Sequence, residues 1–343
     1  MERGLSSYTG CLLGLAAGEG LGNGPETENG FLPTGSHTQM AAYACNGLLL
    51  GVTQGQLTGT MAPPVCYIAA ALTEWARRQV PRGACGTVNC WISRSGRMDQ
   101  RRCPEPQILD LLSCGRTGTM EDRAGALEGP GALMTAAAAG MFYDPERLSR
   151  REIQRLGAEG AALTHGDPGA FLSAAAFAHI LSRILWDGET NGEKLCREAE
   201  AMLRRCFGRE YHQARELAAG FKKVRTLARW RNQDREAVLE KIGSRTAAQV
   251  LTGALYLWMT MPRSTEAAVH TAAKWCGAGA AVVGAILGAV NGEASIPGRW
   301  REALECGEVL RELAEDVFRG CPMMRGSRVF DIEWDEKYNS RDL

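Results

Sequence analysis

The sequence predicts an all-α fold, formed as a single compact helical bundle. Apolar residues recur at spacings of three and four along most of the chain, as they do on the buried face of an amphipathic helix. Alternating Val, Ile, Thr and Tyr segments closed by Asn-Gly or Asp-Gly turns, which indicate β-hairpins, are nearly absent. A chain of 343 residues that is 45% hydrophobic is long enough to bury a large core.

The helical periodicity defines the expected elements in chain order. The apolar run 11–17 is typical of a folded first helix and not of a secretory leader, because Glu2 accompanies Arg3, the run is short and glycines continue beyond it. The segment 82–131, rich in Gly, Pro, Cys and Arg, is expected to be a long functional loop. The apolar stretch 276–290 is shorter than the roughly 18 to 20 residues of a spanning helix, so we expect a buried core helix. The remaining predicted helices cover 40–51, 65–79, 168–186, 193–209, 214–230, 234–241, 247–260 and 299–318.

Glycine recurs at every fourth position in two of these helices. A glycine inside a helix costs about 1 kcal/mol relative to alanine, so such a stripe indicates close approach of two backbones. The striped helix near the start of the chain is therefore expected to pack against the striped helix near its end, at the centre of the bundle. Their members are Gly10, Gly14, Gly18, Gly284, Gly288 and Gly292.

The charge balance and the cysteines restrict the functional class. The 39 Lys and Arg residues equal the 39 Asp and Glu residues, which argues against a general nucleic-acid binder or a polybasic membrane protein. The 12 cysteines form no Cys-x-x-Cys pair, which is typical of reduced, mostly buried thiols. We therefore expect a cytoplasmic protein. A zinc site built from Cys85, Cys90, Cys103 and Cys114 is disfavoured, because their spacing matches no common zinc motif.

The segment Thr164-His165-Gly166-Asp167-Pro168 is the sharpest local feature. Asp167 as N-cap and Pro168 as first helical residue predict a helix start without any functional role. His165 is left unexplained by this pattern: it is either a structural hydrogen-bonding residue or part of an anion site at the helix start. Another helix start is predicted at Ser36-His37-Thr38, with Ser36 or Thr38 as the cap.

Several motifs, taken in order, resemble the ADP-ribosylglycohydrolase family, the dinitrogenase reductase-activating glycohydrolase superfamily, and in particular its bacterial branch. The resemblance runs nearly end to end. The segments that carry it are Gly18-Glu19-Gly20-Leu21-Gly22 with Glu26, Ser36-His37-Thr38-Gln39-Met40, Glu74-Trp75 with Gln79, Gly129-Pro130-Gly131-Ala132-Leu133-Met134, Thr164-His165-Gly166, Ile296-Pro297 with Trp300, and Trp334.

This resemblance implies an orthogonal helical bundle, with residues 1–343 as one domain and a cleft that holds ADP-ribose over two Mg²⁺ or Mn²⁺ ions. It also implies that the partner is an ADP-ribose-like small molecule or an ADP-ribosylated protein, with no nucleic acid and no membrane. Family enzymes cleave the bond between ADP-ribose and a side chain or small acceptor. The implied ligand-contacting residues are Ser36, His37, Thr38, Gly131, His165 and Asp167, with Glu26 as the best candidate for a catalytic acid or base.

The sequence departs from the family where its metals are held. The family's Asp pair is replaced by Ser36 and His37, and its second acidic motif falls, within one residue, on Trp275 and Gly277. No Asp or Glu occurs between positions 268 and 292, and hard divalent cations require oxygen ligands, chiefly carboxylates. The family's Arg and Pro after Met134 are Thr135 and Ala138. The metal ligands are therefore absent at these positions although the scaffold segments are present.

Three interpretations follow. The leading one is a pseudoenzyme that lacks the two-metal site and binds ADP-ribose, a related nucleotide or a protein partner. The second is a diverged hydrolase that cleaves an ADP-ribosyl or other N-glycosidic bond at a rebuilt site, in which His37, His165, Glu26 and Cys276 bind a softer metal such as zinc or act without metal. In the third, the cleft has collapsed and the basic helix near Lys222, otherwise a solvated face, serves as a contact surface.

Overall fold

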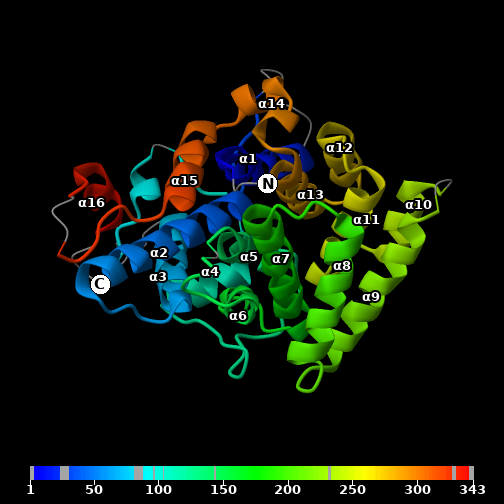
Figure 1. Ribbon diagram of the computed structural model, residues 1–343, viewed down its shortest axis with the longest axis horizontal. Coiled ribbons are helices and arrows are strands. Elements are labelled where there is room, and N and C mark those ends of the chain that lie inside the picture. The colour runs from blue at the N-terminus through cyan, green and yellow to red at the C-terminus, as the bar shows by residue number, and fades with distance from the viewer. Residues whose placement is uncertain are drawn as a thin grey trace.

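The computed structural model describes residues 4–23, 31–80, 88–95, 97–102, 104–142, 144–230, 233–326 and 330–339. Within these ranges the protein has sixteen α-helices and no β-strand, so the predicted all-α fold is confirmed (Figure 1). The helices are α1 (Leu5–Gly22), α2 (Ser36–Thr58), α3 (Pro64–Gln79), α4 (Pro106–Ser113), α5 (Ala132–Met141), α6 (Arg150–Ala162), α7 (Pro168–Asp187), α8 (Gly192–Met202), α9 (His212–Ala228), α10 (Arg235–Ile242), α11 (Ala247–Thr260), α12 (Thr265–Trp275), α13 (Gly277–Asn291), α14 (Gly298–Ala303), α15 (Gly307–Arg319) and α16 (Ile332–Tyr338).

Most periodic segments of the sequence are helices in the structure, and one prediction was wrong. The single helix expected over 299–318 is two helices, α14 and α15, because the chain is extended at Leu304. There Leu304 forms an isolated parallel bridge with Leu32. The predicted helix 193–209 is α8 followed by a π-helical turn, Leu203–Phe207. Helices α4, α5, α6, α12 and α16 were not predicted from periodicity. Of these, α4 lies inside the segment 82–131 that was expected to be a loop.

Helices α1 and α13 pack backbone to backbone, as the glycine stripes predict (Figure 1). A Cβ placed on Gly14 would lie 2.1 Å from the carbonyl oxygen of Gly284, and one on Gly10 would lie 2.2 Å from that of Gly288. Further along, Gly18 meets Ala280. The order of these contacts is antiparallel, so the end of α1 lies beside the start of α13. Gly292 is not part of the stripe, because it follows α13 with φ +78° and faces Ser6.

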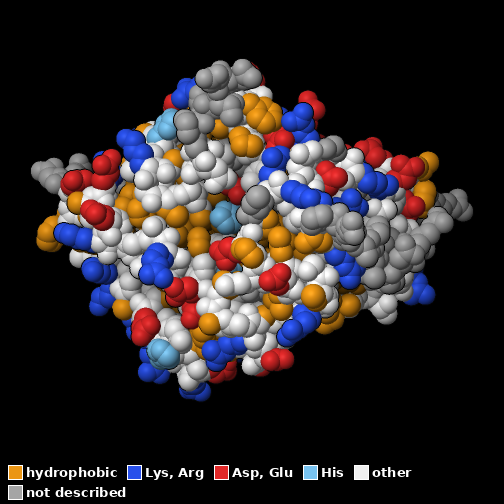
Figure 2. All heavy atoms as spheres, turned by 180° about the vertical axis from the view of Figure 1, so that it is seen from behind, with side chains coloured by type: hydrophobic (Ala, Val, Ile, Leu, Met, Phe, Trp, Pro, Cys, Tyr) orange, Lys and Arg blue, Asp and Glu red, His pale blue; other side chains and the backbone are white. Residues whose placement is uncertain are grey.

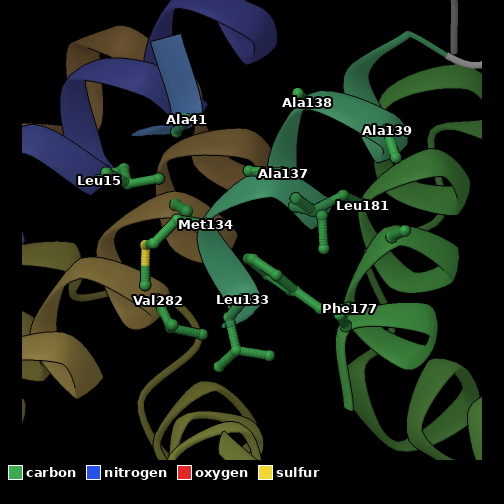
Figure 3. Packing of buried hydrophobic residues seen from close by; sticks show 14 of the residues in the cluster. Leu15, Ala41, Leu133, Met134, Ala137, Ala138, Ala139, Phe177, Leu181 and Val282 are labelled. Atoms are coloured by element: carbon green, nitrogen blue, oxygen red, sulfur yellow. The ribbon is translucent and has the colours of Figure 1, made fainter. Parts of the chain in front are cut away.

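Helix α5 forms the middle of the core, and all ten of its residues are buried. Figure 3 shows Met134 directed toward Val282 of α13, while Phe177 of α7 lies against the other side of α5. The small residues of α5 let α7 approach closely: a Cβ on Gly140 would lie 2.9 Å from the carbonyl oxygen of Ala178. Helix α5 therefore holds the loop that precedes it, including Gly131, at a fixed depth in the molecule.

Two apolar helices are buried inside the protein. Among the described residues, α7 is long and apolar enough to cross a membrane by length and composition, but 83% of its apolar window is covered by the rest of the chain. Helix α13 is almost wholly buried, which confirms the core helix expected over 276–290. Ten cysteines are described, and all ten are free thiols. On the face shown in Figure 2, basic and acidic side chains are interspersed, in agreement with the zero net charge.

The close contact of α1 with α13 gives a direct stability test. Gly14→Ala would force a methyl group against the backbone of Gly284, so we expect the free energy of unfolding to fall by about 3 kcal/mol. Gly220→Ala is the matched control, because it also lies inside a helix and its Cβ would meet only Thr252 Oγ1 at 3.8 Å. That variant is expected to be unchanged or up to about 1 kcal/mol more stable. Equal urea midpoints for the two variants would contradict the close packing.

Candidate functional site

The carboxylate of Glu19, near the end of α1, is buried against the start of α2. One oxygen, Oε1, accepts a hydrogen bond from the backbone N–H of His37 at 2.9 Å. The other, Oε2, accepts from the N–H of Thr38 at 2.8 Å and from its hydroxyl at 2.6 Å. The Glu19 side chain is only 2% exposed. Its negative charge is thus satisfied by the unpaired donors and the positive dipole end of α2.

This contact replaces the helix cap that the sequence suggested. The N-cap residue of α2 is Gly35, which has no side chain to cap the helix, and neither Ser36 nor Thr38 acts as its cap. A Cβ on Gly35 would lie 2.1 Å from Glu19 Oε1, so a larger residue would collide with the carboxylate. Glu19 therefore caps α2 from a different helix, and the prediction of a Ser36 or Thr38 cap was wrong.

Two histidines converge next to this helix start. His37 comes from the first turn of α2, and His165 comes from the turn between α6 and α7. A Cβ placed on Gly131 would lie 3.3 Å from His165 Nε2 and 3.9 Å from His37 Nε2. Gly131 is the N-cap of α5 and is itself buried. The structure therefore brings together three residues that are far apart in the sequence and that we had named as candidates.

The imidazole of His165 is fully buried. Its Nδ1 lies 2.8 Å from the Thr164 hydroxyl, and its Nε2 has no hydrogen-bond partner in the part of the chain that the structure describes. Burial, with a smaller contribution from nearby His37, lowers the pKa of His165 from 6.5 to about 3. The ring is therefore neutral at physiological pH.

Asp167 lies at the start of α7 and caps it. Its Oδ1 accepts from the N–H of Ala170 at 3.1 Å, and Pro168 is the first helical residue, which confirms the predicted helix start. Asp167 lines a separate cavity of about 800 Å³ between the start of α7 and helices α9, α10 and α11, together with Leu217, Lys223 and Gln249. The structural role expected for Asp167 is thus present.

Trp275 and Gly277, on which the family's second acidic motif was expected to fall, lie at the junction of α12 and α13. Gly277 packs against Gly22: a Cβ on Gly22 would lie 2.3 Å from the Cα of Gly277. The indole of Trp275 is wedged against Gly253 of α11 and Gly279 of α13. Cys276 Sγ lies 3.8 Å from the carbonyl oxygen of Ser244. The start of α13 is therefore filled by glycine contacts and an indole, and it carries no carboxylate.

A second carboxylate near the start of α2 is also fully engaged. Glu305, whose side chain is 4% exposed, accepts from the N–H of Thr34 at 2.9 Å. It also pairs with Arg102 and, at 3.3 Å, with Arg97. Sequence reasoning did not identify Glu305, because its partner Thr34 is 271 positions away and no local pattern marks the pair.

The donor set does not fit the two hard cations that the resemblance implies. Mg²⁺ and Mn²⁺ need several oxygen ligands, yet Glu19 is bonded to the start of α2 and Glu305 to two arginines. The described part of the chain contains no group of three or more His, Cys, Asp and Glu residues that could hold a metal ion. Glu26, the candidate acid or base, lies outside the described residues.

A ligand-sized cavity opens beside this cluster. It has a volume of about 870 Å³ and includes Thr164 and Gly129, the neighbours of His165 and of Pro130-Gly131. Three arginines line it, Arg116, Arg123 and Arg245, and all three are exposed. The cavity therefore offers guanidinium groups, which match phosphate and carboxylate geometry.

Comparison with known proteins agrees with the fold. A family model described as ADP-ribosylglycohydrolase matches residues 2–326. A solved structure described as an "ADP-ribosylglycohydrolase-related protein complex" is similar with a TM-score of 0.60 and 22% identity, over 93% of this chain and 98% of that one. At this identity the structural likeness establishes the fold alone. A search of curated proteins gave no match.

The buried state of His165 gives a pH-dependent prediction. Because its pKa is about 3 in the folded protein and 6.5 when free, only the unfolded chain takes up this proton between those values. The contribution of His165 to stability is thus complete above pH 6.5 and is lost progressively as the pH falls toward 3. The wild type should therefore lose more unfolding free energy than His165→Gln as the pH falls from 6.5 toward 3, so the difference between the two proteins should decrease. A difference that stays constant in denaturant titrations from pH 7 to about pH 4 would contradict a buried neutral imidazole.

Proposed function

The chain belongs to the ADP-ribosylglycohydrolase family, and we propose that it is a pseudoenzyme of this family that binds ADP-ribose or a related nucleotide without metal-dependent hydrolysis. The ligand is either the free small molecule or an ADP-ribosyl group on a protein. The binding region in this proposal consists of the start of α2, the loop before α5 and the turn before α7, with Ser36, His37, Thr38, Gly131, His165 and Asp167 as the candidate residues.

The state of Glu19 is the observation that carries the proposal. A carboxylate that already accepts three hydrogen bonds from one helix start has little capacity left to bind a cation. Freeing it for a metal would leave the first N–H groups of α2 without partners inside the protein, which is costly for buried donors. The hydrolytic arrangement is therefore opposed both by the missing acids and by the stability of the helix start.

The arginine-lined cavity supports ligand binding. ADP-ribose carries a diphosphate, and Arg116, Arg123 and Arg245 supply positive charge at the rim of a space beside Thr164. Its volume of about 870 Å³ is in the range of small-molecule sites. Glu105, Asp110 and Glu128 also line the cavity and offer acceptors for hydroxyl groups. In this proposal the arginines hold the phosphates and the acids select the sugar or base.

We also propose that residues 1–343 act as one domain in the cytoplasm of a bacterium. One continuous hydrophobic cluster supports the single domain, since it extends from Tyr8 of α1 to Tyr338 of α16. The free thiols support a reducing compartment.

Calorimetry with ADP-ribose, in the presence of Mg²⁺ or of a chelator, tests the proposal. We expect saturable binding with the same Kd in both conditions, because no step of binding needs the cation. Arg123→Ala is expected to weaken binding about ten-fold through the loss of a charge-assisted contact. Arg263→Ala is the matched control, because it removes another exposed arginine, in the turn before α12, that does not line the cavity.

Hydrolysis of an ADP-ribosylated arginine substrate is measured in parallel. No turnover is expected with Mg²⁺ present. Clear turnover that His37→Ala abolishes would support the diverged hydrolase instead, and the absence of binding at millimolar ADP-ribose would exclude the ligand-binding part of the proposal.

A further inference from the structure

The two histidines of the site present the same ring nitrogen to one small space. His165 Nε2 and His37 Nε2 lie 3.3 and 3.9 Å from a single point, the position that a Cβ on Gly131 would occupy. This space exists because residue 131 is glycine. His165 is 0% exposed and its Nε2 has no partner among the described residues, although buried polar atoms are almost always hydrogen-bonded. An unpaired buried nitrogen that faces a second imidazole needs an explanation.

Each histidine is held from behind by an oxygen atom. His37 Nδ1 lies 3.5 Å from Glu19 Oε1, and His165 Nδ1 lies 2.8 Å from the Thr164 hydroxyl. A carboxylate beside Nδ1 favours the tautomer with the proton on that nitrogen, which leaves a lone pair on Nε2. The Thr164 hydroxyl lies 3.5 Å from the Ala161 carbonyl oxygen, and donation in that direction lets it accept from His165 Nδ1–H. Metal-ligating histidines are typically oriented in this way by an acceptor behind the ring.

We propose that His37 Nε2 and His165 Nε2 together bind one nitrogen-preferring divalent ion of the zinc class. Zn²⁺, Co²⁺, Ni²⁺ and Cu²⁺ all bind neutral imidazole, whereas Mg²⁺ prefers oxygen ligands. This site goes beyond the proposed function. His37 and His165 are among the candidate residues for the nucleotide, but neither of them lines the arginine-lined cavity, so the ion and the nucleotide phosphates have different protein ligands.

The protein supplies two ligands to this ion. No third His, Cys, Asp or Glu joins them among the described residues, so water or an oxygen of a bound ligand completes a four-coordinate arrangement. Glu19 does not bind the ion, since its oxygens serve the start of α2, but it orients His37. The ion therefore has open positions, and a chelator should remove it readily.

Gly131 provides a test that spares both histidines. Its backbone, with φ −53° and ψ −27°, is in a region that alanine adopts without strain. The methyl group of Gly131→Ala would lie 3.3 Å from His165 Nε2 and 3.9 Å from His37 Nε2, in the space next to both nitrogens. His37→Gln is a second mild change, because that side chain is 25% exposed.

The experiment is a titration of the full chain, reduced and freed of metal by chelation, with Co²⁺ alone while the visible absorption is recorded. We expect one saturable set of bands of four-coordinate cobalt with nitrogen and oxygen ligands, displaced by Zn²⁺ but not by millimolar Mg²⁺. His37→Gln, His165→Ala and Gly131→Ala are each expected to weaken Co²⁺ binding at least about ten-fold. His212→Ala removes an exposed histidine at the start of α9 and is expected to bind as the wild type does.

Several outcomes would overturn the site. These are the absence of a saturable cobalt spectrum, bands of thiolate charge transfer that assign the ion to exposed Cys66 or Cys114, and equal affinity of the wild type and His37→Gln. If His165→Ala does not fold, as judged by circular dichroism, Gly131→Ala and His37→Gln decide the result. ADP-ribose binding in the presence of a chelator is measured separately, so failure of this site and failure of the proposed function are distinguishable.

Discussion

The backbone contact between α1 and α13 is the constraint on which the rest of the site depends. Glycines on both helices bring carbonyl oxygens of one within about 2 Å of where side chains of the other would begin. Because the helices run antiparallel, the end of α1 meets the start of α13, and Gly22 lies against Gly277. This places Glu19, on the last turns of α1, and the two motif positions of the family in one region of the molecule. The end of α1, the start of α2 and the start of α13 therefore lie together in one region of the molecule.

Two buried carboxylates near the start of α2 are stabilised by groups of the protein itself. In an acidic two-metal site, the cations neutralise the carboxylates. Here Glu19 is satisfied by the start of α2, and Glu305 by Arg97 and Arg102. Buried charges are stable only when they are paired or hydrogen-bonded.

The fold was more predictable from the sequence than the site. Periodicity predicted α7, α9 and α11 closely, because their apolar stripes face one core, and the glycine stripes predicted the α1–α13 contact. Helix α5 has no polar face and therefore no periodic signal. The break at Leu304 depends on pairing with Leu32, which no local pattern encodes. Within the site, the motif positions marked His37, Gly131 and His165, but Glu19 was recognised only as part of the motif Gly18-Glu19-Gly20-Leu21-Gly22. Its role as a cap depends on Gly35 leaving room for the carboxylate, which is a tertiary effect.

The central claim is that Glu19 belongs to the helix start and not to a metal. Diffraction from a crystal soaked in Mn²⁺, measured at the manganese absorption edge, tests this claim most directly, because the anomalous signal locates the ion itself. We expect no manganese peak at the start of α2, with both Glu19 oxygens still bonded to His37 and Thr38. A peak about 2.1 Å from a Glu19 oxygen, with the α2 contacts broken, would contradict the account.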